Sequence, residues 1–301
     1  MRAFRFGVVF TGAADRRGFT ELARGLEGDG FSSLLVADHY VNPMACTPMI
    51  TAAAMVTTTL RVGSYVYGND FRHPALLAKE AATIDVLSEG RFELGIGAGW
   101  LRDEYVQAGV AFDEPGVRVG RFEESVGIIR RLLDGEQVEH QGEHYRLHKL
   151  AGEPLPVQRR IPLLIGAGAR RMVSLAGREA DIVGFVPPAL RAGGLDVSAF
   201  SEDAFAQRIG WLDEAVAAGR RADGGPERSV LMFASGEAPA ADDDLGWMDG
   251  RTAATSPYAL VGSVDAMCDT LQERRERWGV TYIVCWEEDI DLLRPVVARL
   301  A

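Results

Sequence analysis

Asp38 and His39 stand next to each other directly after a short apolar run that predicts a strand. An imidazole changes its charge near physiological pH, so a histidine at a strand end is suited to give or take a proton during a reaction. Asp38 is placed either to orient the histidine ring or to contact a ligand. The alternative is a histidine that is hydrogen-bonded within the fold. We take His39 as the candidate general acid or base.

Two short glycine-containing loops are the second candidate feature, and each follows an apolar run. Glycine lets backbone N–H groups approach a ligand closely. The second loop also opens a predicted helix, whose free N–H groups and positive end bind anions, and Arg170 and Arg171 add positive charge there. We expect both loops to hold a cofactor; ordinary turns with surface arginines are the alternative. Their residues are Gly97, Ala98 and Gly99 in the first loop and Gly166, Ala167, Gly168 and Ala169 in the second.

Asn69 and Trp100 are the candidate substrate contacts. Asn69 follows the third strand-like run, and Trp100 directly follows the first glycine loop. We expect the amide of Asn69 to reach a bound ligand or substrate, and the indole of Trp100 to line the substrate pocket. Arg72 and His73, which come shortly after Asn69, are expected to brace this loop.

Three histidines raise the question of a metal site. His140, His144 and His148 are spaced by four residues, which on a helix would place three ligands on one face. Gly142 interrupts this segment, and the pattern predicts a hairpin over 138–147 instead. Helical spacing has no meaning in a hairpin, so we predict no metal site.

The elements that must position these residues alternate between strands and helices. Strands are expected at 4–10, 33–37, 62–67, 92–96, 163–165, 181–185, 229–234 and 282–285, and helices at 19–26, 47–58, 74–87, 120–133, 169–177, 205–218, 264–278 and 292–300. Eight strand–helix pairs indicate an α/β (β/α)₈ barrel forming one domain over 1–301, with insertions near 134–162, 187–204 and 238–256. A doubly wound sheet is the competing fold, but neither glycine loop has the third glycine of a dinucleotide fingerprint.

The composition limits the partners. The 301 residues are 47% hydrophobic, enough for a large core, and the formal net charge of −11 argues against nucleic acid and anionic membranes. The cysteines Cys46, Cys268 and Cys285 are far apart, which favours a reducing cytoplasm over a disulfide framework. The first residues lead directly into a strand without signal-peptide features, which supports the same location. We expect a small-molecule substrate.

Four segments carry a resemblance to a known family. They are VADHY (36–40), RHPALLAKEAATIDVLSEGRFELGIGAGW (72–100), GEHYRL (142–147) with PLLIGAGARR (162–171), and SPYALVGSVDAM (256–267). The chain resembles the bacterial luciferase-like oxidoreductases, most closely the branch that uses the deazaflavin coenzyme F420. The second segment is highly specific, and because the four are spread over nearly the whole chain, the resemblance covers most of it.

The resemblance implies where a flavin-type ring would bind. The ring would lie at the C-terminal mouth of the barrel, backed by a non-prolyl cis peptide at Tyr65–Val66, with Asp38 and His39 beside it. The glycine loops and Arg170 would hold the ring and its phosphate-bearing chain. Trp100 departs from the glutamate expected in the sugar-phosphate dehydrogenases of this family, so their substrate chemistry does not transfer.

The resemblance also implies the activity. We expect hydride transfer between coenzyme F420 and a small organic substrate with an activated C=C, C=N or C=O bond. An FMN-dependent monooxygenase, which uses reduced flavin and oxygen and needs a partner reductase, is the alternative. A non-catalytic cofactor-binding protein is the third possibility. Dimers are common in the family, so a homodimer is expected.

Overall fold

The described residues, 2–219 and 224–301, form a closed parallel barrel in the computed structural model. The sheet order is β3-β2-β1-β13-β10-β9-β8-β5, and β3 also pairs with β5, through Val62 with Phe92 and Gly63 with Glu93, which closes the cylinder. The predicted (β/α)₈ fold is confirmed. The barrel strands are β1 (Arg5–Phe10), β2 (Ser33–Val36), β3 (Arg61–Ser64), β5 (Phe92–Gly97), β8 (Leu163–Ala167), β9 (Ile182–Phe185), β10 (Glu227–Leu231) and β13 (Val280–Trp286).

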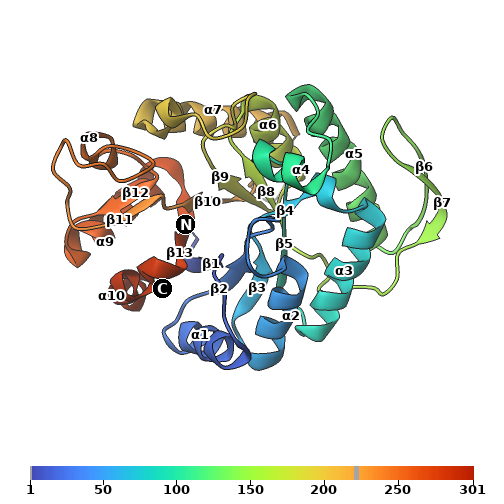
Figure 1. Cartoon of the computed structure of the whole chain (residues 1–301), viewed down its shortest axis with the longest axis horizontal. Helices are drawn as coiled ribbons and strands as arrows, with labels where there is room; N and C mark the ends of the chain where they lie inside the picture. Colours follow the sequence, from blue (N-terminus) through green and yellow to red (C-terminus); the bar gives the residue numbers. More distant parts are fainter. Residues whose placement is uncertain (1, 220–223) are drawn as a thin grey trace.

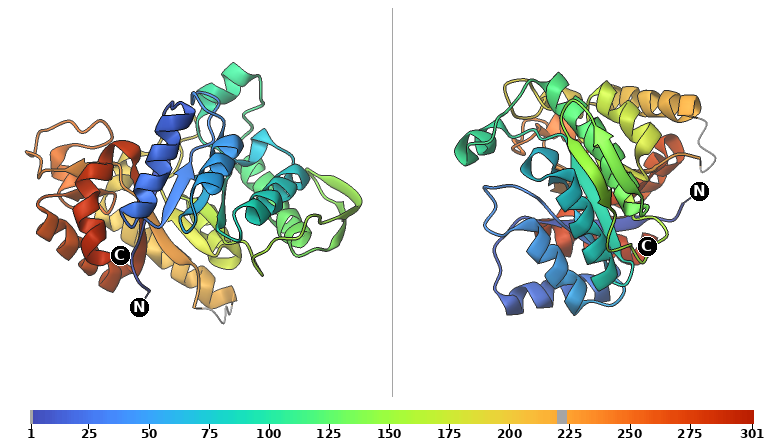
Figure 2. Two further views of the ribbon diagram at one scale, coloured as in Figure 1. Left: turned by 90° about the horizontal axis from the view of Figure 1, so that it is seen from below. Right: turned by 90° about the vertical axis from the view of Figure 1, so that its right-hand side faces the viewer.

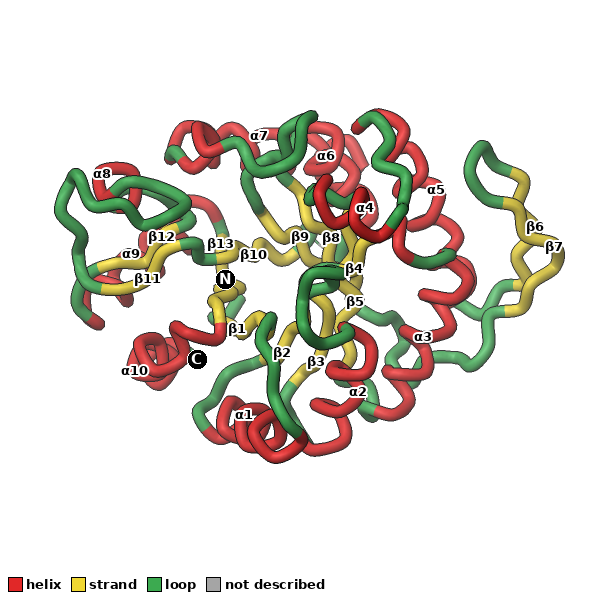
Figure 3. Tube along the Cα trace, viewed as in Figure 1, coloured by secondary structure: helices red, strands yellow, loops and turns green. Residues whose placement is uncertain are grey.

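Helices surround the strands, as Figures 1 and 3 show. One long helix follows each barrel strand, and buried apolar side chains fill the space between helices and sheet. The sequence marks several helix starts; Pro74 begins α3, and the His73 side chain accepts a bond from Ala75 N at 3.2 Å. The helices are α1 (Arg16–Gly28), α2 (Cys46–Val56), α3 (Pro74–Leu87), α5 (Pro115–Leu133), α6 (Arg170–Glu179), α7 (Glu202–Gly219), α9 (Val264–Trp278) and α10 (Ile290–Leu300).

Short elements fill the predicted insertions. The expected hairpin is confirmed as β6 (Gln137–Gln141) and β7 (Arg146–Ala151), and it stands away from the barrel in Figure 1 and in the left view of Figure 2. The third predicted strand is interrupted: β3 ends at Ser64, and pairing to β5 resumes only at β4 (Tyr67–Gly68). The remaining elements are α4 (Arg102–Ala108), β11 (Ala234–Gly236), α8 (Gly250–Ala253), β12 (Ala259–Val261) and the 3₁₀ turns η1 (Asn69–Phe71), η2 (Val197–Phe200) and η3 (Glu287–Asp289).

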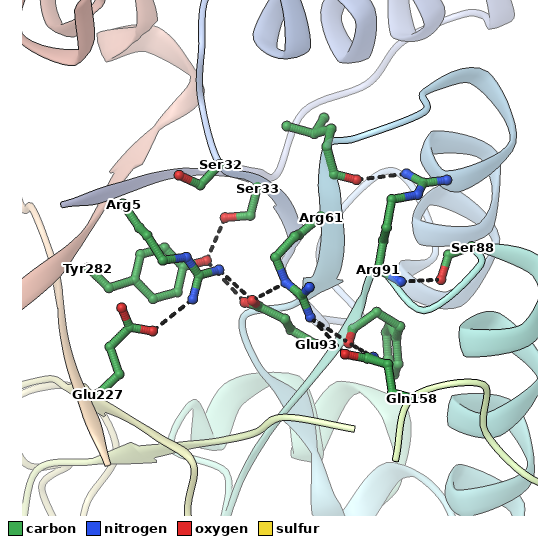
Figure 4. A network of polar contacts seen from close by, with 12 residues as sticks. Arg5, Ser32, Ser33, Arg61, Ser88, Arg91, Glu93, Gln158, Glu227 and Tyr282 are labelled. Atoms are coloured by element: carbon green, nitrogen blue, oxygen red, sulfur yellow. Dashed lines mark hydrogen bonds and ion pairs between the residues drawn. The ribbon is translucent and has the colours of Figure 1, made fainter. Parts of the chain in front are cut away.

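A network of hydrogen bonds and ion pairs fills the N-terminal end of the barrel (Figure 4). Arg5, Arg61 and Glu227 each begin a strand, and Glu93 of β5 receives bonds from Arg5 and from Arg61 Nε, the latter at 2.5 Å. Arg5 also donates to Glu227 at 2.7 Å, and its guanidinium lies 4.3 Å from the centre of the Tyr282 ring. Because Glu93 is only 2% exposed, its charge is tolerable only with these partners.

Candidate functional site

His39 is held by a glutamate on α4. The His39 Nδ1 atom lies 2.9 Å from Glu104 Oε1, and Oε2 of the same carboxylate accepts the Tyr40 backbone N–H at 3.0 Å. Glu104 is 2% exposed, whereas the side chain of His39 stays 22% exposed. A carboxylate at Nδ1 places the ring proton there, so the neutral ring presents Nε2 as an acceptor. No hydrogen bond to another described residue occupies Nε2.

Trp100 flanks the same histidine. Its ring stands at 90° to the His39 ring with centroids 5.8 Å apart, and it is partly exposed. The structure therefore brings this sequence-predicted substrate contact directly beside the candidate acid or base.

Asp38 points to a different partner. Its two carboxylate oxygens accept bonds from Arg72, at 2.5 and 3.2 Å, and one of them also accepts the Gly68 N–H at 3.0 Å. These bonds tie the end of β2 to β4, and they confirm that Arg72 braces this loop. Of the two roles considered for Asp38, the orientation of His39 is provided by Glu104 instead, and a contact between Asp38 and a cofactor stays a prediction.

The peptide bond between Tyr65 and Val66 is cis, as the resemblance implies. The Tyr65 side chain points into the barrel, where a Cβ added to Gly184 would lie 3.2 Å from its hydroxyl. Its hydroxyl is buried, and burial raises the pKa of this phenol above its usual range. Tyr65 can therefore contact a bound ring only through its backbone.

Val66 links the glycine-containing strand ends. A Cβ added at Gly97 would lie 2.9 Å from Val66 Cγ2, and one at Gly166 would lie 3.5 Å from the same atom. The side chain of Val66 is partly exposed and covers bare backbone of β5 and β8. The strand ends that were far apart in the sequence thus meet around one aliphatic side chain.

The side chain of Arg118 holds the first glycine loop in place. Arg118 of α5 donates to the carbonyls of Ala98 at 3.4 Å and Gly99 at 2.5 Å. Gly99 has a φ of +80°, and an added Cβ would lie 1.9 Å from the Tyr105 hydroxyl, so only glycine fits there. Arg118 and Tyr105 therefore fix the conformation of this loop.

The second glycine loop has mixed roles. At Gly168 an added Cβ would lie 2.7 Å from backbone atoms of Val186 and Pro188, so this glycine serves close packing, and Ala167 is fully buried. Ala169 is exposed and caps α6 without a side-chain bond, which leaves N–H groups of the first turn available for an anion.

The side chains of Arg170 and Arg171 form ion pairs on the surface of the protein. Arg170 lies 3.3 Å from Glu214, and Arg171 lies 2.6 Å from Glu123. Exposed ion pairs contribute little to the stability of the fold. Both side chains are therefore able to exchange their carboxylate partner for a phosphate. The positive end of α6 and two nearby cations are therefore present, as predicted.

Asn69 carries a buried acceptor without a partner. The residue is 1% exposed; its amide nitrogen donates to the Tyr145 hydroxyl at 3.3 Å, whereas Oδ1 makes no hydrogen bond to a described residue. The adjacent Asp70 lies 2.9 Å from Arg121, and burial, which Arg121 opposes, raises the pKa of Asp70. An unsatisfied buried carbonyl oxygen just past the cis bond fits a ligand N–H donor.

The sequence-predicted site residues follow neighbouring strands and therefore lie on one rim of the barrel. His39 follows β2, Val66 follows β3, Gly97–Gly99 ends β5 and Gly166–Ala169 ends β8; β2 pairs with β3, β3 with β5, and β5 with β8. The C-terminal rim is where barrels of this type place their ligands. The arrangement provides an aliphatic side chain at Val66, glycine backbone at two strand ends, a helix start without a side-chain cap and an oriented imidazole, which together suit a planar cofactor with a phosphate-bearing chain.

Glu104 is the site residue that the sequence analysis missed. It lies in an unpredicted helix and contacts a residue 65 positions earlier. Acidic residues in a first helical turn normally serve the helix itself, so nothing in the local sequence distinguishes Glu104 from Asp103.

The hairpin histidines and the composition of the helices bear on a metal site and on a membrane span. His140 lies 2.8 Å from Glu124 and His148 lies 3.0 Å from Glu139, each on the hairpin, and no group of three potential metal ligands occurs among residues 2–219 and 224–301. Within the same residues, every helix is too short or too polar to span a bilayer.

Comparison with known proteins identifies relatives. Residues 4–194 match the sequence model of the luciferase-like monooxygenases. The chain is 33% identical over 202 residues to the F420-dependent glucose-6-phosphate dehydrogenase of Nakamurella multipartita, covering 64% of this chain and 58% of that protein. It is 34% identical over 157 residues to the 5,10-methylenetetrahydromethanopterin reductase of Archaeoglobus fulgidus, covering 52% and 45%. The matches thus span about half the length of these relatives.

Solved structures show the same fold. The coenzyme F420-dependent tetrahydromethanopterin reductase of Methanopyrus kandleri superposes with a TM-score of 0.80 at 18% identity, covering 100% of both chains. An F420-dependent secondary alcohol dehydrogenase in complex with an F420–acetone adduct superposes with a TM-score of 0.79 at 18% identity, again over 100% of both chains.

Proposed function

Because the chain belongs to the luciferase-like monooxygenase family, we propose that it is an oxidoreductase that uses the deazaflavin coenzyme F420. It transfers a hydride between the deazaflavin and a small organic substrate with an activated C=C, C=N or C=O bond. The observation that carries the proposal is the meeting of Val66, Gly97 and Gly166 at the rim that also holds His39. The printed names of the relatives, which include F420-dependent dehydrogenases, support the choice of cofactor.

Each residue has a defined part in this proposal. Val66 would back the ring, the backbone of Gly97–Gly99 would donate to it, and Asn69 Oδ1 would accept a ring N–H. The start of α6 would hold the phosphate, with Arg170 and Arg171 released from their surface pairs. The bound deazaflavin supplies a two-electron hydride carrier that reacts poorly with oxygen. His39 Nε2 takes or gives the proton that accompanies the hydride.

Titration with two cofactors tests the proposal. Purified protein is titrated with coenzyme F420 and, separately, with FMN, while ligand and protein fluorescence are followed. We expect a dissociation constant at least about 100-fold lower for coenzyme F420, a difference of roughly 2.7 kcal/mol. Tighter binding of FMN would favour the monooxygenase alternative, and binding of F420 without turnover of any substrate would leave a non-catalytic cofactor-binding protein.

Glu104 is proposed to act as a positioning residue for His39. A charge-assisted hydrogen bond contributes about 1.5–3 kcal/mol, so Glu104→Gln should lower turnover roughly 10–100-fold with cofactor affinity unchanged. Asp103→Asn, an exposed neighbour on the same helix, is the matched control and should have no effect. In a His39→Ala background, Glu104→Gln should change turnover by less than about twofold, because paired residues are not additive. An additive loss would show that Glu104 acts independently of His39.

A second copy of the chain is the proposed partner of the α2–α3 face. An outer barrel helix normally has a polar face, but α2 contains no charged residue, and Met55 is 63% exposed on it. The neighbouring α3 adds Leu76 at 51% and Leu87 at 46%. An apolar face of this kind marks an interaction site, and we propose that it forms a homodimer.

Light scattering after size-exclusion chromatography tests the dimer. The unmodified chain should elute at twice its mass, and the double variant Met55→Glu, Leu76→Asp should elute as a monomer with an unchanged circular dichroism spectrum. Leu155→Asp, at an exposed leucine on the connector after β7, is the control and should remain dimeric. A monomeric unmodified chain would refute this proposal.

A further inference from the structure

A buried arginine, Arg208, contacts the second glycine loop. It lies on α7, which packs against α6 (Figure 1), and it is only 2% exposed. Its Nε donates to the Gly168 carbonyl at 3.1 Å, and its Nη1 donates to the Ala199 carbonyl, also at 3.1 Å. Gly168 follows β8, and Ala199 belongs to η2, which follows β9. Arg208 therefore joins the loops at the ends of two strands that pair with each other.

The positive charge of Arg208 has no countercharge in the described part of the chain. None of the carboxylates in residues 2–219 and 224–301 forms an ion pair with it; its partners are the two carbonyls and the Tyr258 ring, whose centre lies 5.9 Å from the guanidinium. Bonds to carbonyls satisfy N–H groups but leave the charge in place. A buried charge is costly unless it is paired. An anion bound close to this loop would supply the missing countercharge.

The bond from Arg208 also fixes the direction of a backbone N–H group. The Gly168 carbonyl and the Ala169 N–H belong to the same peptide unit, and in a trans peptide these two groups point in opposite directions. Because the carbonyl points toward Arg208, the Ala169 N–H points away from it. Ala169 is exposed, and its N–H makes no hydrogen bond to a described residue. The loop thus presents a free donor beside the start of α6.

The two exposed arginines at the start of α6 differ from Arg208. Arg170 lies 3.3 Å from Glu214 and Arg171 lies 2.6 Å from Glu123, so each already has a carboxylate partner. Water and salt screen exposed charges, whereas a buried charge is screened much less. Of these three arginines, only Arg208 lacks a carboxylate partner among the described residues.

We infer that Arg208 is a positioning residue for the phosphate of the cofactor: it directs the Ala169 N–H to the phosphate and supplies a buried countercharge. This inference rests on the proposed function, since it concerns the phosphate site at the start of α6. It assigns the main electrostatic contribution to Arg208 and not to the exposed Arg170 and Arg171. Affinity for a phosphate-bearing cofactor therefore depends on Arg208, whereas affinity for the ring portion does not.

Paired ligands with and without a phosphate test the inference. Dissociation constants are measured by fluorescence titration for coenzyme F420 and for its phosphate-free deazaflavin–ribitol fragment, in the unmodified protein and in Arg208→Gln. Glutamine can still donate to a carbonyl but carries no charge. We expect Arg208→Gln to weaken binding of coenzyme F420 at least about 10-fold and binding of the fragment by less than about twofold. Arg208→Lys keeps the charge and should retain most of the preference for the phosphate.

Two control variants separate this effect from a general loss of structure. Arg274 is also buried, at 9% exposed, donates to backbone carbonyls between 256 and 259, and forms no ion pair with a described carboxylate. Arg274→Gln should leave the ratio of the two dissociation constants unchanged, and Arg170→Gln should change it by less than about threefold. Equal weakening of both ligands by Arg208→Gln, or an equal change of the ratio in Arg274→Gln, would overturn the inference.

The same titrations with FMN and riboflavin, which differ only in the phosphate, distinguish a failure of the inference from a failure of the proposed function. Tighter binding of FMN than of coenzyme F420 would contradict the proposed cofactor, yet a loss specific to FMN in Arg208→Gln would still support the inference. Binding of none of the four ligands would contradict both. If Arg208→Gln does not fold, Arg208→Met, which is uncharged and fills a buried site, replaces it with the same expected change of ratio.

Discussion

Replacement of His39 by alanine is expected to lower turnover roughly 10²–10⁴-fold, the usual contribution of a positioned general acid or base. Affinity for the deazaflavin should stay within about twofold, because the ring is held by Val66 and the glycine loops. The measurement is single-turnover oxidation of reduced coenzyme F420 beside an equilibrium titration of the same preparation. The loss should appear in the chemical step and not in binding.

His148→Ala is the control for this variant. His148 lies on the hairpin with its side chain 80% exposed, and its replacement should leave turnover unchanged. Turnover by His39→Ala at the unmodified rate would remove His39 from the mechanism. A parallel loss of deazaflavin affinity would instead make His39 a binding residue.

Removal of Glu93 is expected to cause the largest loss of stability. Glu93→Ala leaves the guanidinium groups of Arg5 and Arg61 without their shared carboxylate inside the barrel. Breaking a buried pair by removing one partner typically costs 3–5 kcal/mol, so the free energy of unfolding should fall by about that amount. Chemical denaturation followed by circular dichroism measures it.

Two comparisons make this result specific. Glu93→Gln keeps most of the hydrogen bonds and should cost less than the alanine variant. Glu21→Ala removes an exposed pair with Arg17 and should change the free energy of unfolding by at most about 1 kcal/mol. Equal effects of Glu93→Ala and Glu21→Ala would mean that the network does not stabilise the barrel.

The fold was largely predictable because its signals are local. The α3 helix runs from Pro74 to Leu87 as its sequence indicates, since proline marks a helix start and an apolar face continues through it. The hairpin was also predictable, because Gly142 lies between two alternating runs. Some boundaries differ: α1 begins at Arg16, capped by Asp15, three residues before the expected start at 19. Aspartate is a preferred capping residue, so Asp15 marks this earlier start in the sequence.

Non-local contacts account for what the sequence could not reveal. The β11–β12 pair joins Ala234–Gly236 to Ala259–Val261 across a long excursion, and nothing in these short runs specifies the pairing. The contact of Gly168 with a cofactor stays a prediction, but its close packing, in which an added Cβ would lie 2.7 Å from the backbone of Pro188, could not be foreseen. In both cases the decisive partner is remote in the chain.

Some features of the candidate site were predictable from the sequence, and others were not. The histidine, the cis bond and the glycine loops lie at strand ends, so the order of the strands alone places them on one rim. The connection between Glu104 and His39 depends on how α4 packs, and the pairing of Asp38 with Arg72 depends on the turn at Gly68. Side-chain partners of this kind follow from tertiary packing and not from spacing.

A crystal structure with oxidised coenzyme F420 is the most direct test of the central claim. We predict that the planar ring lies against Val66, touches the backbone of Gly97–Gly99, directs its phosphate to the start of α6 and turns its reactive carbon toward His39. A ring that touches fewer than three of these stretches, or that binds away from the C-terminal rim, would contradict the account.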